Sequence, residues 1–349
     1  MAEDHEGFLY PQVDTDSCID CGLCQKVCPE LHPSSERTPL GVDAAIHSND
    51  GIRLKSSSGG VFTAIAEKVI ANGGVVFGAA FNHNWDVEHQ YADTIEGIQR
   101  FRGSKYVQST IGNTFAQAQQ FLKQGRKVLF TGTPCQIAGL HKFLRKDYPN
   151  LLSTEILCHS VPSPKLWRKY LSEITNGASV RSINFRNKAT GWSKYAYSIS
   201  IEHSYGTYTE PASGPYMKAL TNNLSTRPSC ASCTARRGKS GADISLGDCW
   251  GIWDIKPEID DNKGMSIVQV FTTKGSEVLK SINIQTHQIQ LQDVVKYNSG
   301  LGAPKPLHPK REYFFDSIDT APAKAVIVQS LLPKKLSFLE RLKRKLRNL

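Results

Sequence analysis

The sequence lacks any apolar run long enough to cross a membrane, and it lacks a secretory signal. Its first residues, Met-Ala-Glu-Asp-His-Glu, are acidic and polar instead of basic and apolar. These absences lead us to expect a cytoplasmic protein. Since the cytosol keeps thiols reduced, we expect the nine cysteines to bind metal and not to pair as disulfides.

A strong excess of charge is also missing from most of the chain. The formal net charge is +10, but residues 334–349 account for +6 of it, with seven Lys and Arg against Glu340. The remaining body is only mildly basic, and no nucleic-acid recognition motif is present. We therefore expect no nucleic acid among the partners.

The basic end of the chain has its own pattern. Leucines recur at steps of three and four, at Leu336, Leu339, Leu342, Leu346 and Leu349. The pattern predicts a basic amphipathic tail over residues 330–349, and such a helix can make peripheral contact with the anionic inner face of a membrane through residues 334–349. The alternatives are a helix docked on the protein's own body and a frayed end.

Four cysteines near the start form the most specific motif: Cys18-Ile-Asp-Cys21-Gly-Leu-Cys24-Gln-Lys-Val-Cys28-Pro29. This spacing is the bacterial-ferredoxin run for an iron–sulfur cluster. Gly22 permits a positive φ in the loop, and Pro29 turns the chain away after the fourth thiol. A disulfide pair or a zinc knuckle is the alternative, but zinc sites usually combine a close pair with a distant one. We predict a ferredoxin-type segment over residues 1–33.

The fourth cysteine of this run raises a question, because in two-cluster ferredoxins it ligates the other cluster. Only one such run is present. Either Cys18, Cys21, Cys24 and Cys28 bind one cluster, or Cys28 binds a cluster whose other ligands lie elsewhere.

Two loops follow that suit an anion. Ser56-Ser57-Ser58-Gly59-Gly60 precedes a helical pattern over residues 61–70, and free N–H groups at a helix start favour phosphate. An ordinary N-cap with glycines is the alternative. Arg100 to Tyr106 form a basic, aromatic loop that could hold a dinucleotide, or could be a solvated charged loop.

The middle of the chain alternates strand and helix patterns, which predicts a largely parallel sheet. We expect strands over residues 75–81, 127–131, 153–158 and 266–272, and helices over about 111–123, 134–146, 165–175 and 274–281. Residues 34–52 and 302–309 are polar or proline-rich and are interpreted as linkers. Alternation over residues 181–186 and 195–201, with a turn at Tyr205-Gly206, predicts an antiparallel subdomain. The fold class is therefore α/β (α+β).

Four more cysteines fall at positions suited to a ligand. Cys135 and Cys158 come just past the ends of two predicted neighbouring strands, where open α/β sheets bind ligands. A buried structural role is the alternative for each. Cys230-Ala-Ser-Cys233 is a redox dithiol, half a zinc site or half an iron–sulfur site. Together the four match the number that a second cubane needs, whereas we interpret Cys249 as a buried small hydrophobe.

Several motifs together make the chain resemble the coenzyme F420 hydrogenase/dehydrogenase beta-subunit family. They are Ser57-Ser58-Gly59-Gly60, Arg102-Gly103-Ser104-Lys105-Tyr106-Val107, Gly132-Thr133-Pro134-Cys135-Gln136, Leu157-Cys158-His159, Cys230-x-x-Cys233 and Asp243-Ile-Ser-Leu-Gly-Asp248. Cys158-His159-Ser160 differs slightly from the family's usual Cys-His-Gly.

The resemblance implies a mixed, largely parallel α/β body that binds FAD, preceded by a ferredoxin module in bacterial members. It implies an N-terminal flavin-binding region over residues 50–130 and a C-terminal region with a second cluster site over 131–300. It suggests that the flavin is contacted by Ser58, Gly59, Gly60, Gly103, Ser104, Lys105 and Tyr106. It also suggests Cys135, Cys158, Cys230 and Cys233 as ligands of a cluster near the flavin.

The chain departs from the family pattern at its start. Bacterial members have two Cys runs separated by a segment like Glu6-Gly7-Phe8-Leu9-Tyr10-Pro11, which here stands at the beginning. We expect that Cys18–Cys28 is half of a two-cluster module in an N-terminally shortened sequence.

These features predict an oxidoreductase that passes electrons between one or two 4Fe-4S clusters, FAD and an organic acceptor. His159 is the candidate proton donor. The expected partners are a redox protein, either a ferredoxin or another subunit, and a small-molecule electron acceptor. Archaeal relatives act on the deazaflavin coenzyme F420, whereas bacterial relatives often belong to surface-polysaccharide gene clusters. The alternatives are a non-catalytic electron-transfer subunit and a structural zinc protein.

Overall fold

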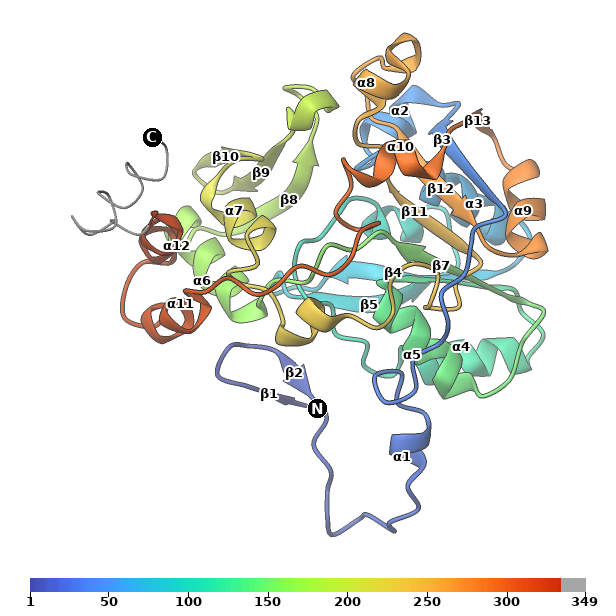
Figure 1. The fold of residues 1–349 in the computed structure, drawn as a ribbon, viewed down its shortest axis with the longest axis horizontal. Coiled ribbons are helices and arrows are strands. Elements are labelled where there is room, and N and C mark those ends of the chain that lie inside the picture. The colour runs from blue at the N-terminus through green and yellow to red at the C-terminus, as the bar shows by residue number, and fades with distance from the viewer. Residues whose placement is uncertain (334–349) are drawn as a thin grey trace, which may run out of the picture.

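The computed structural model describes residues 1–333 and contains a large mixed sheet beside a small antiparallel one (Figure 1). Residues 334–349, the basic part of the amphipathic tail predicted over residues 330–349, lie outside the described residues. In spatial order the large sheet consists of β13 (Ile284–Gln288), β3 (Gly41–His47), β12 (Ser266–Val270), β11 (Ile244–Asp248), β7 (Leu151–Ile156), β6 (Val128–Gly132), β4 (Val75–Phe81) and β5 (Val87–Ala92).

Five strands of the large sheet point the same way. β11, β7, β6 and β4 are paired in parallel, and β3 shares their direction because β12 runs antiparallel to both β3 and β11. β5, β12 and β13 run the opposite way. The prediction of a largely parallel sheet is thus confirmed, and the carboxyl ends of these five strands meet at one edge.

Helices cover both faces of this sheet. α3 (Val61–Ala71) and α9 (Thr273–Lys280) pack on one face, and α4 (Thr114–Lys123) and α5 (Pro134–Leu144) on the other. Successive residues of β4 therefore belong to different cores, Val76 to the first and Phe77 to the second. Because both faces are buried, β4 is a nearly continuous apolar run, as the sequence predicts for residues 75–81.

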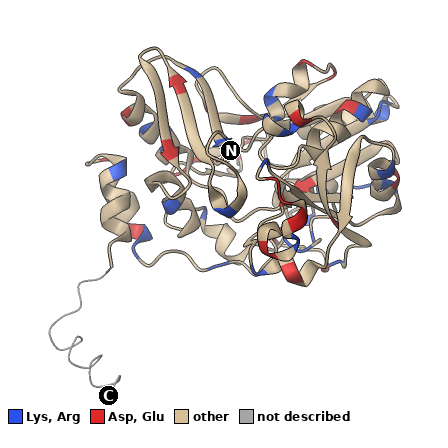
Figure 2. Cartoon of the chain, turned by 90° about the horizontal axis from the view of Figure 1, so that it is seen from above, with Lys and Arg blue, Asp and Glu red and all other residues tan. Residues whose placement is uncertain are grey.

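The small sheet forms the second part of the molecule, with strands in the order β10 (Gly206–Pro211), β9 (Ser198–His203) and β8 (Val180–Asn187). It confirms the predicted antiparallel subdomain and the turn at Tyr205-Gly206. Its core is shared with α6 (Pro164–Thr175), α7 (Pro215–Thr221), α11 (Arg311–Ser317) and α12 (Ala323–Leu331). Figure 2 shows this part beside the large sheet, with the positions of acidic and basic residues interspersed along the chain in both.

Shorter elements fill the connections. They are β1 (Ala2–Glu3), β2 (Leu9–Tyr10), α1 (Leu23–Lys26), α2 (Asp50–Leu54), α8 (Ile252–Ile255), α10 (Leu291–Val295) and the 3-10 turns η1 (Gly97–Phe101), η2 (Ser193–Tyr195), η3 (Pro228–Ser232) and η4 (Pro257–Ile259). Within residues 1–333, no helix is both long and apolar enough to traverse a bilayer.

The prediction of a linker over residues 34–52 is wrong. β3 lies inside the large sheet between β12 and β13, and α2 follows it. Asp43 and His47 interrupt the apolar pattern of β3, so its strand character comes from pairing with segments more than 200 residues away. A local pattern cannot reveal such pairing.

The N-terminus is fastened to the helices of the second part. Glu6 and Arg311 form a buried bidentate ion pair, and Phe8 is fully buried in the same core. Arg311 Nε also donates to the Thr226 carbonyl at 3.1 Å. We call this contact the N-terminal clasp.

Breaking the clasp by Arg311→Ala leaves the Glu6 carboxylate buried without its partner. We expect a loss of about 3–5 kcal/mol in the free energy of unfolding, measured by urea denaturation. Arg168→Ala is the matched control, because the Arg168–Glu3 pair is half exposed and is expected to contribute at most about 1 kcal/mol. Equal losses in the two variants would contradict a buried clasp.

A buried histidine on β5 packs against β6 close to the common edge of the sheet. His89 on β5 stacks on Phe130 with ring centroids 5.6 Å apart. Its Nε2 lies 2.9 Å from the Thr131 carbonyl and must donate to it, so Nδ1 accepts from the Ser109 hydroxyl at 2.6 Å. Burial lowers the pKa of His89 to about 4.

The lowered pKa of His89 predicts acid sensitivity. The neutral ring stabilises the fold above pH 6.5, and this contribution is lost as the pH falls toward 4, because the unfolded chain binds the proton first. Relative to His89→Gln, the wild-type free energy of unfolding should fall by up to about 1.4 kcal/mol per pH unit in this window. Parallel curves for the two proteins between pH 6.5 and 4 would show that His89 is not responsible.

Candidate functional site

The structure brings four predicted cysteines together at the common edge of the sheet. Cys135 lies in the first turn of α5, directly after β6, and Cys158 lies two residues after β7. Cys230 lies in η3, and Cys233 follows it. We call these four side chains the inner thiol group.

The thiols of this group affect one another's ionisation. Burial raises the pKa of Cys158 well above its usual value, and the neighbouring Cys230, Cys135 and Cys233 raise it further. Burial likewise raises the pKa of Cys230 to about 11, again with contributions from Cys135 and Cys233. Desolvation also raises the pKa of Cys135, and the neighbouring Cys233 raises it further. Ionised thiols at these positions repel one another.

The donor set fits an iron–sulfur cluster. All four thiols are free, and four cysteines are the ligand set of a cubane, in which each thiolate binds a different iron. In residues 1–333, no three His, Cys, Asp or Glu side chains converge on the position of a single metal ion.

Arg236 is a residue that the sequence prediction did not assign. Its guanidinium is buried and donates to the carbonyl of His159 and, at 3.3 Å, to that of Ser299. Its charge favours the thiolate forms of Cys158 and Cys230. The only signal for it was its place among the basic residues after Cys230-x-x-Cys233.

The candidate proton donor, His159, has both ring nitrogens occupied. Nε2 lies 2.8 Å from Asn223 Oδ1, and Nδ1 lies 2.9 Å from Ser299 Oγ. The Asn223 amide nitrogen donates to the Pro306 carbonyl at 2.9 Å, so its oxygen faces His159 and Nε2 carries the proton. Burial lowers the pKa of His159.

The ferredoxin-type run lies outside the body. Cys18, Cys21 and Cys24 are exposed and Cys28 is partly buried. Gly22 has φ = 64°, which confirms the predicted positive φ. The Glu30 carboxylate is close enough to raise the pKa of Cys135, so the end of the run approaches the inner thiol group.

The two loops predicted to contact a flavin meet at the same edge. Ser57 Oγ accepts a hydrogen bond from the Ser104 backbone N–H at 2.6 Å and contacts the Ser104 hydroxyl at 2.9 Å. Arg102 Nε donates to Thr63 Oγ1, in the first turn of α3, at 3.2 Å. Residues 57–60 and 102–104 therefore form one continuous surface at the start of α3.

Glycine is required at two positions of this surface. A Cβ on Gly59 would lie 2.2 Å from the Ala45 carbonyl oxygen, and Gly60 caps α3 with φ = 87°. Neither position leaves room or freedom for an ordinary side chain. The α3 N-terminus has no side-chain cap, so its first N–H groups remain available to an anion.

Lys105 and Tyr106 do not extend into solvent. Lys105 Nζ donates to the carbonyls of Arg100, Arg102 and Gly103 at 2.9–3.1 Å, and burial lowers its pKa to about 7. The Tyr106 hydroxyl accepts from Arg186 of β8 at 3.1 Å. Lys105 therefore braces its own loop, and Tyr106 connects that loop to the small sheet.

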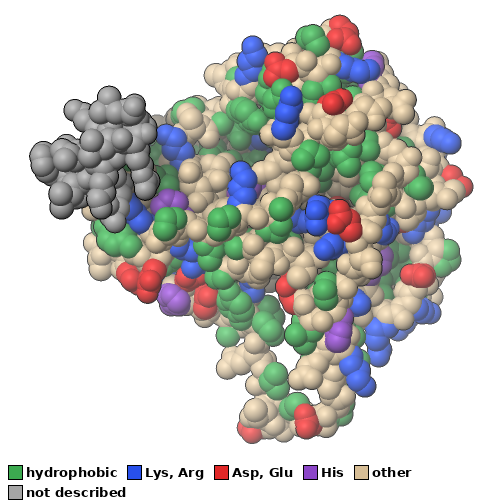
Figure 3. All heavy atoms as spheres, in the orientation of Figure 1, with side chains coloured by type: hydrophobic (Ala, Val, Ile, Leu, Met, Phe, Trp, Pro, Cys, Tyr) green, Lys and Arg blue, Asp and Glu red, His purple; other side chains and the backbone are tan. Residues whose placement is uncertain are grey.

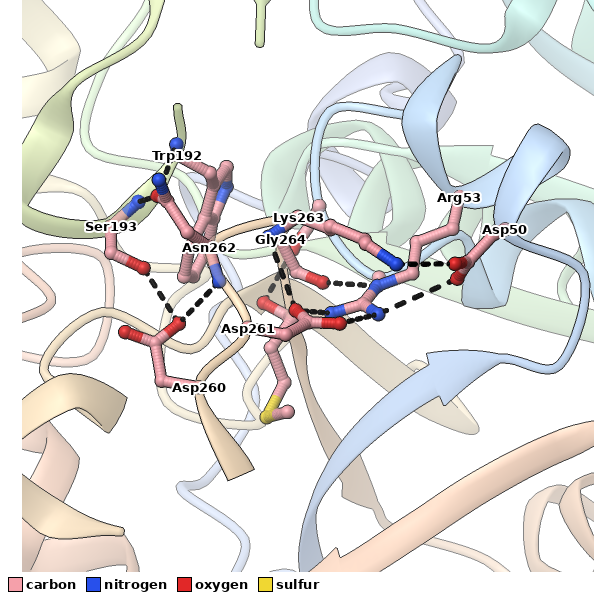
Figure 4. A network of polar contacts seen from close by, with 12 residues as sticks. Asp50, Arg53, Trp192, Ser193, Asp260, Asp261, Asn262, Lys263 and Gly264 are labelled. Atoms are coloured by element: carbon pink, nitrogen blue, oxygen red, sulfur yellow. Dashed lines mark hydrogen bonds and ion pairs between the residues drawn. The ribbon is translucent and has the colours of Figure 1, made fainter. Parts of the chain in front are cut away.

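The loop between β11 and β12 holds this surface in place (Figure 4). Arg53 is fully buried, forms a bidentate pair with Asp261 at 2.5 and 2.7 Å, and donates to the Gly264 carbonyl at 2.7 Å. Asn262 Oδ1 accepts the backbone N–H groups of Trp192 and Ser193, both at 2.8 Å. Three segments distant in sequence are thereby joined around the Ser57–Gly60 turn.

A second charged pair, Arg186 with Asp248, lies next to the Ser57–Gly60 turn. Arg186 donates to Asp248, at the end of β11, at 2.7 Å and packs over the rings of Tyr197 and Trp250. Burial raises the pKa of Asp248, but Arg186 and a hydrogen bond from Ser58 oppose that rise. Arg186 and Lys188, whose Nζ donates to the Ser58 carbonyl at 2.7 Å, were not predicted as site residues.

Residues 107–110 connect the Gly103–Tyr106 loop with the inner thiol group. Gln136, next to Cys135, donates to the Ser109 carbonyl at 3.3 Å, and the Gln108 N–H donates to the Pro162 carbonyl at 3.3 Å. The chain leaving the Gly103–Tyr106 loop thus contacts the segments that hold Cys135 and Cys158.

Family models match three parts of the sequence. Residues 44–115 match the N-terminal model of the coenzyme F420 hydrogenase/dehydrogenase beta subunit, and residues 125–296 match the C-terminal model of the same family. Residues 10–33 match a 4Fe-4S binding domain.

Two curated relatives match part of the chain. The F subunit of the F(420)H(2) dehydrogenase of Methanosarcina mazei is 25% identical over 121 residues, 34% of each chain. An uncharacterized protein of Methanocaldococcus jannaschii is 27% identical over 137 residues, 37% of this chain and 38% of the relative. The matches thus span little more than a third of the relatives' length.

One solved structure shares the fold over most of the chain. It is a chain of the F420-reducing [NiFe] hydrogenase complex from Methanosarcina barkeri, with 18% identity and a TM-score of 0.52, and the similarity covers 84% of this chain and 91% of that one. The two family models together span more than half of the sequence, in the expected order and over the residues that form the site. The chain belongs to the coenzyme F420 hydrogenase/dehydrogenase beta-subunit family.

Proposed function

We propose that this chain is an iron–sulfur flavoprotein oxidoreductase that passes electrons between 4Fe-4S clusters, FAD and an organic acceptor. The main support is the meeting of the inner thiol group with the Ser57–Gly60 and Gly103–Tyr106 loops at one edge of the sheet. The 4Fe-4S model match over residues 10–33 and the family membership agree with it.

In this proposal Cys135, Cys158, Cys230 and Cys233 hold the inner cluster. The surface formed by Ser58–Gly60 and Gly103–Tyr106 holds FAD, with its phosphates at the α3 N-terminus beside Arg102. When bound, FAD supplies exchange of two electrons with an organic molecule or of single electrons with a cluster.

The other residues of the site stabilise the charge of the thiolates and position the loops that would hold the flavin. Arg236 offsets the negative charge of the thiolates, and Arg186 with Asp248 fixes the distance between the small sheet and the Ser58 turn. We propose that His159 accepts and donates protons in the reaction. Since Asn223 can only accept from Nε2, a proton reaches the ring through the Ser299 hydroxyl at Nδ1.

The names of two similar proteins support a proposal for the class of acceptor. One curated relative is named as part of an F(420)H(2) dehydrogenase, and the solved neighbour belongs to an F420-reducing complex. We propose a deazaflavin or a similar planar organic acceptor as the first substrate to assay.

The second candidate function is an electron-transfer subunit without its own substrate. The exposure of Cys18, Cys21 and Cys24 favours it, because an exposed cluster is suited to exchange electrons with another protein. Turnover of a deazaflavin by the purified chain would exclude this candidate.

The proposal is tested first by iron, acid-labile sulfide and flavin per chain after anaerobic purification and reconstitution. About four or eight irons with one flavin are expected. A chain that takes up neither iron nor flavin would refute the proposed function.

Removing one inner ligand should remove one cluster. We expect Cys158→Ala to lose about four irons per chain and the corresponding visible absorption. Cys249→Ala is the control, because Cys249 is fully buried among apolar side chains and should leave the iron content unchanged. Unchanged iron in Cys158→Ala would contradict the ligand assignment.

Filling the space at Gly59 should weaken flavin binding. The new Cβ of Gly59→Ala must displace the Ala45 carbonyl or the Ser57–Gly60 turn, so we expect the flavin Kd to rise about tenfold or more at unchanged iron content. Gly41→Ala on β3 meets no atom within 4 Å and is the control. Flavin fluorescence titration measures both, and equal affinities would place the flavin elsewhere.

A further inference from the structure

The last described helix, α12, is apolar on two opposite faces. One face carries Ala323, Val326 and Ile327, which are buried where α12 packs against α6, α7 and α11. An open groove runs along the opposite face and is lined by Pro322, Lys324, Ala325, Val328, Gln329 and Leu332. We call these six residues the outer face of α12. A helix that is apolar all round is normally covered on every side.

The outer face is exposed in the structure. Val328 and Leu332 are 48% and 55% exposed, and Lys324 is the one charged residue among the six. Figure 1 shows α12 on the side of the second part that lies away from the large sheet. Contiguous apolar surface of this kind marks a site of contact with another protein or with a membrane.

The basic segment of the chain begins where this surface ends. Lys310 Nζ donates to the Leu332 carbonyl at 2.8 Å and so holds the end of α12. Lys334 comes two residues later, and residues 334–349 carry seven basic side chains against Glu340, with leucines at steps of three and four. The apolar outer face is thus continuous in the chain with a sequence suited to anionic lipid.

Length and charge argue against residues 334–349 as the cover of the outer face. The nine residues of α12 span about 14 Å, whereas sixteen residues in a helix span about 24 Å, so several leucines would stay uncovered. The helices α6, α7, α11 and α12 carry six basic side chains against three acidic ones. They repel a further group of cations, whereas an anionic lipid surface attracts both.

We propose that the outer face of α12 binds the surface of an anionic membrane together with residues 334–349. The apolar side chains of both enter the boundary between headgroups and acyl chains, and the cations of residues 334–349 lie among the headgroups. The sequence pattern indicates only the basic segment, and the structure adds a second element that is packed on the body. This inference does not rest on the proposed function, because it uses no cofactor site.

A contact through α12 fixes the orientation of the protein on the membrane. A terminal segment alone would leave the body free to turn, whereas α12 is packed against three other helices. In the space-filling view the cysteine run forms the lower edge of the molecule, on another side than α12 (Figure 3). The run therefore stays accessible to a redox partner while the protein is bound to lipid.

Cosedimentation of the full 349-residue chain with lipid vesicles is the first test. Vesicles of phosphatidylcholine and phosphatidylserine should bind the chain at about 0.1 M salt, and binding should weaken strongly at about 1 M salt because the charges are then screened. Vesicles of phosphatidylcholine alone should bind much less. Absence of binding to the anionic vesicles would overturn the proposal.

The decisive variant makes the outer face polar without changing a charge. In Val328→Gln, Leu332→Gln the basic segment is intact, and we expect the partition coefficient on anionic vesicles to fall at least about tenfold. The control is Ile95→Gln, Val295→Gln, which changes side chains that are 41% and 39% exposed in the other part of the molecule and should bind like the wild type. Circular dichroism checks that both variants are folded. Equal binding of the two double variants would overturn the proposal.

The same variant distinguishes lipid from the protein's own basic segment as the occupant. If residues 334–349 covered the outer face, making it polar would release them and strengthen vesicle binding, which would overturn the proposal. Weaker binding both in this variant and on deletion of residues 334–349, with the deletion removing the salt-sensitive part, would support it. Either result leaves the iron and flavin contents unchanged, so failure here is distinguishable from failure of the proposed function.

Discussion

Buried thiolates side by side repel one another, and the loops that meet at the common edge of the large sheet bring such thiols together. Cys135, Cys158 and Cys230 are each made harder to ionise by burial and by one another. Arg236 compensates only in part. The inner cluster that we propose would resolve the repulsion, since it would replace the thiol protons with shared metal charge. The fold places these thiols on separate loops, so metal binding also joins those loops.

The direction of the strands makes this gathering possible. Because β3, β11, β7, β6 and β4 all end at one edge, the segments after them meet there, although they lie up to 200 residues apart. Polar contacts then set the distances between these segments. Arg53 with Asp261 and Arg186 with Asp248 lock the Ser57–Gly60 turn against the small sheet. The site is therefore built from rigid strand ends and buried ion pairs.

The sequence predicted the βα alternation, the small antiparallel sheet and the position of Cys135 and Cys158 at neighbouring strand ends. It did so because apolar runs, glycine stops and proline caps are local signals. The prediction of a linker over residues 34–52 failed, since the partners of β3 come from the far end of the chain. Arg53, Arg186 and Arg236 were missed as site residues for the same reason, because a charged residue is expected to be exposed until its buried partner is known. Lys105 was assigned to the correct loop, but its contacts are with that loop's own carbonyls.

The N-terminal clasp also fixes an order of events during synthesis. Glu6 pairs with Arg311, 305 residues later in the chain. At about 5–20 residues per second, a ribosome needs roughly 15 to 60 s to produce that arginine after the glutamate has been made. During this interval the cysteine run is already complete, whereas the body that anchors the chain on either side of it is not. Metal binding at the run therefore does not have to wait for the folding of that body.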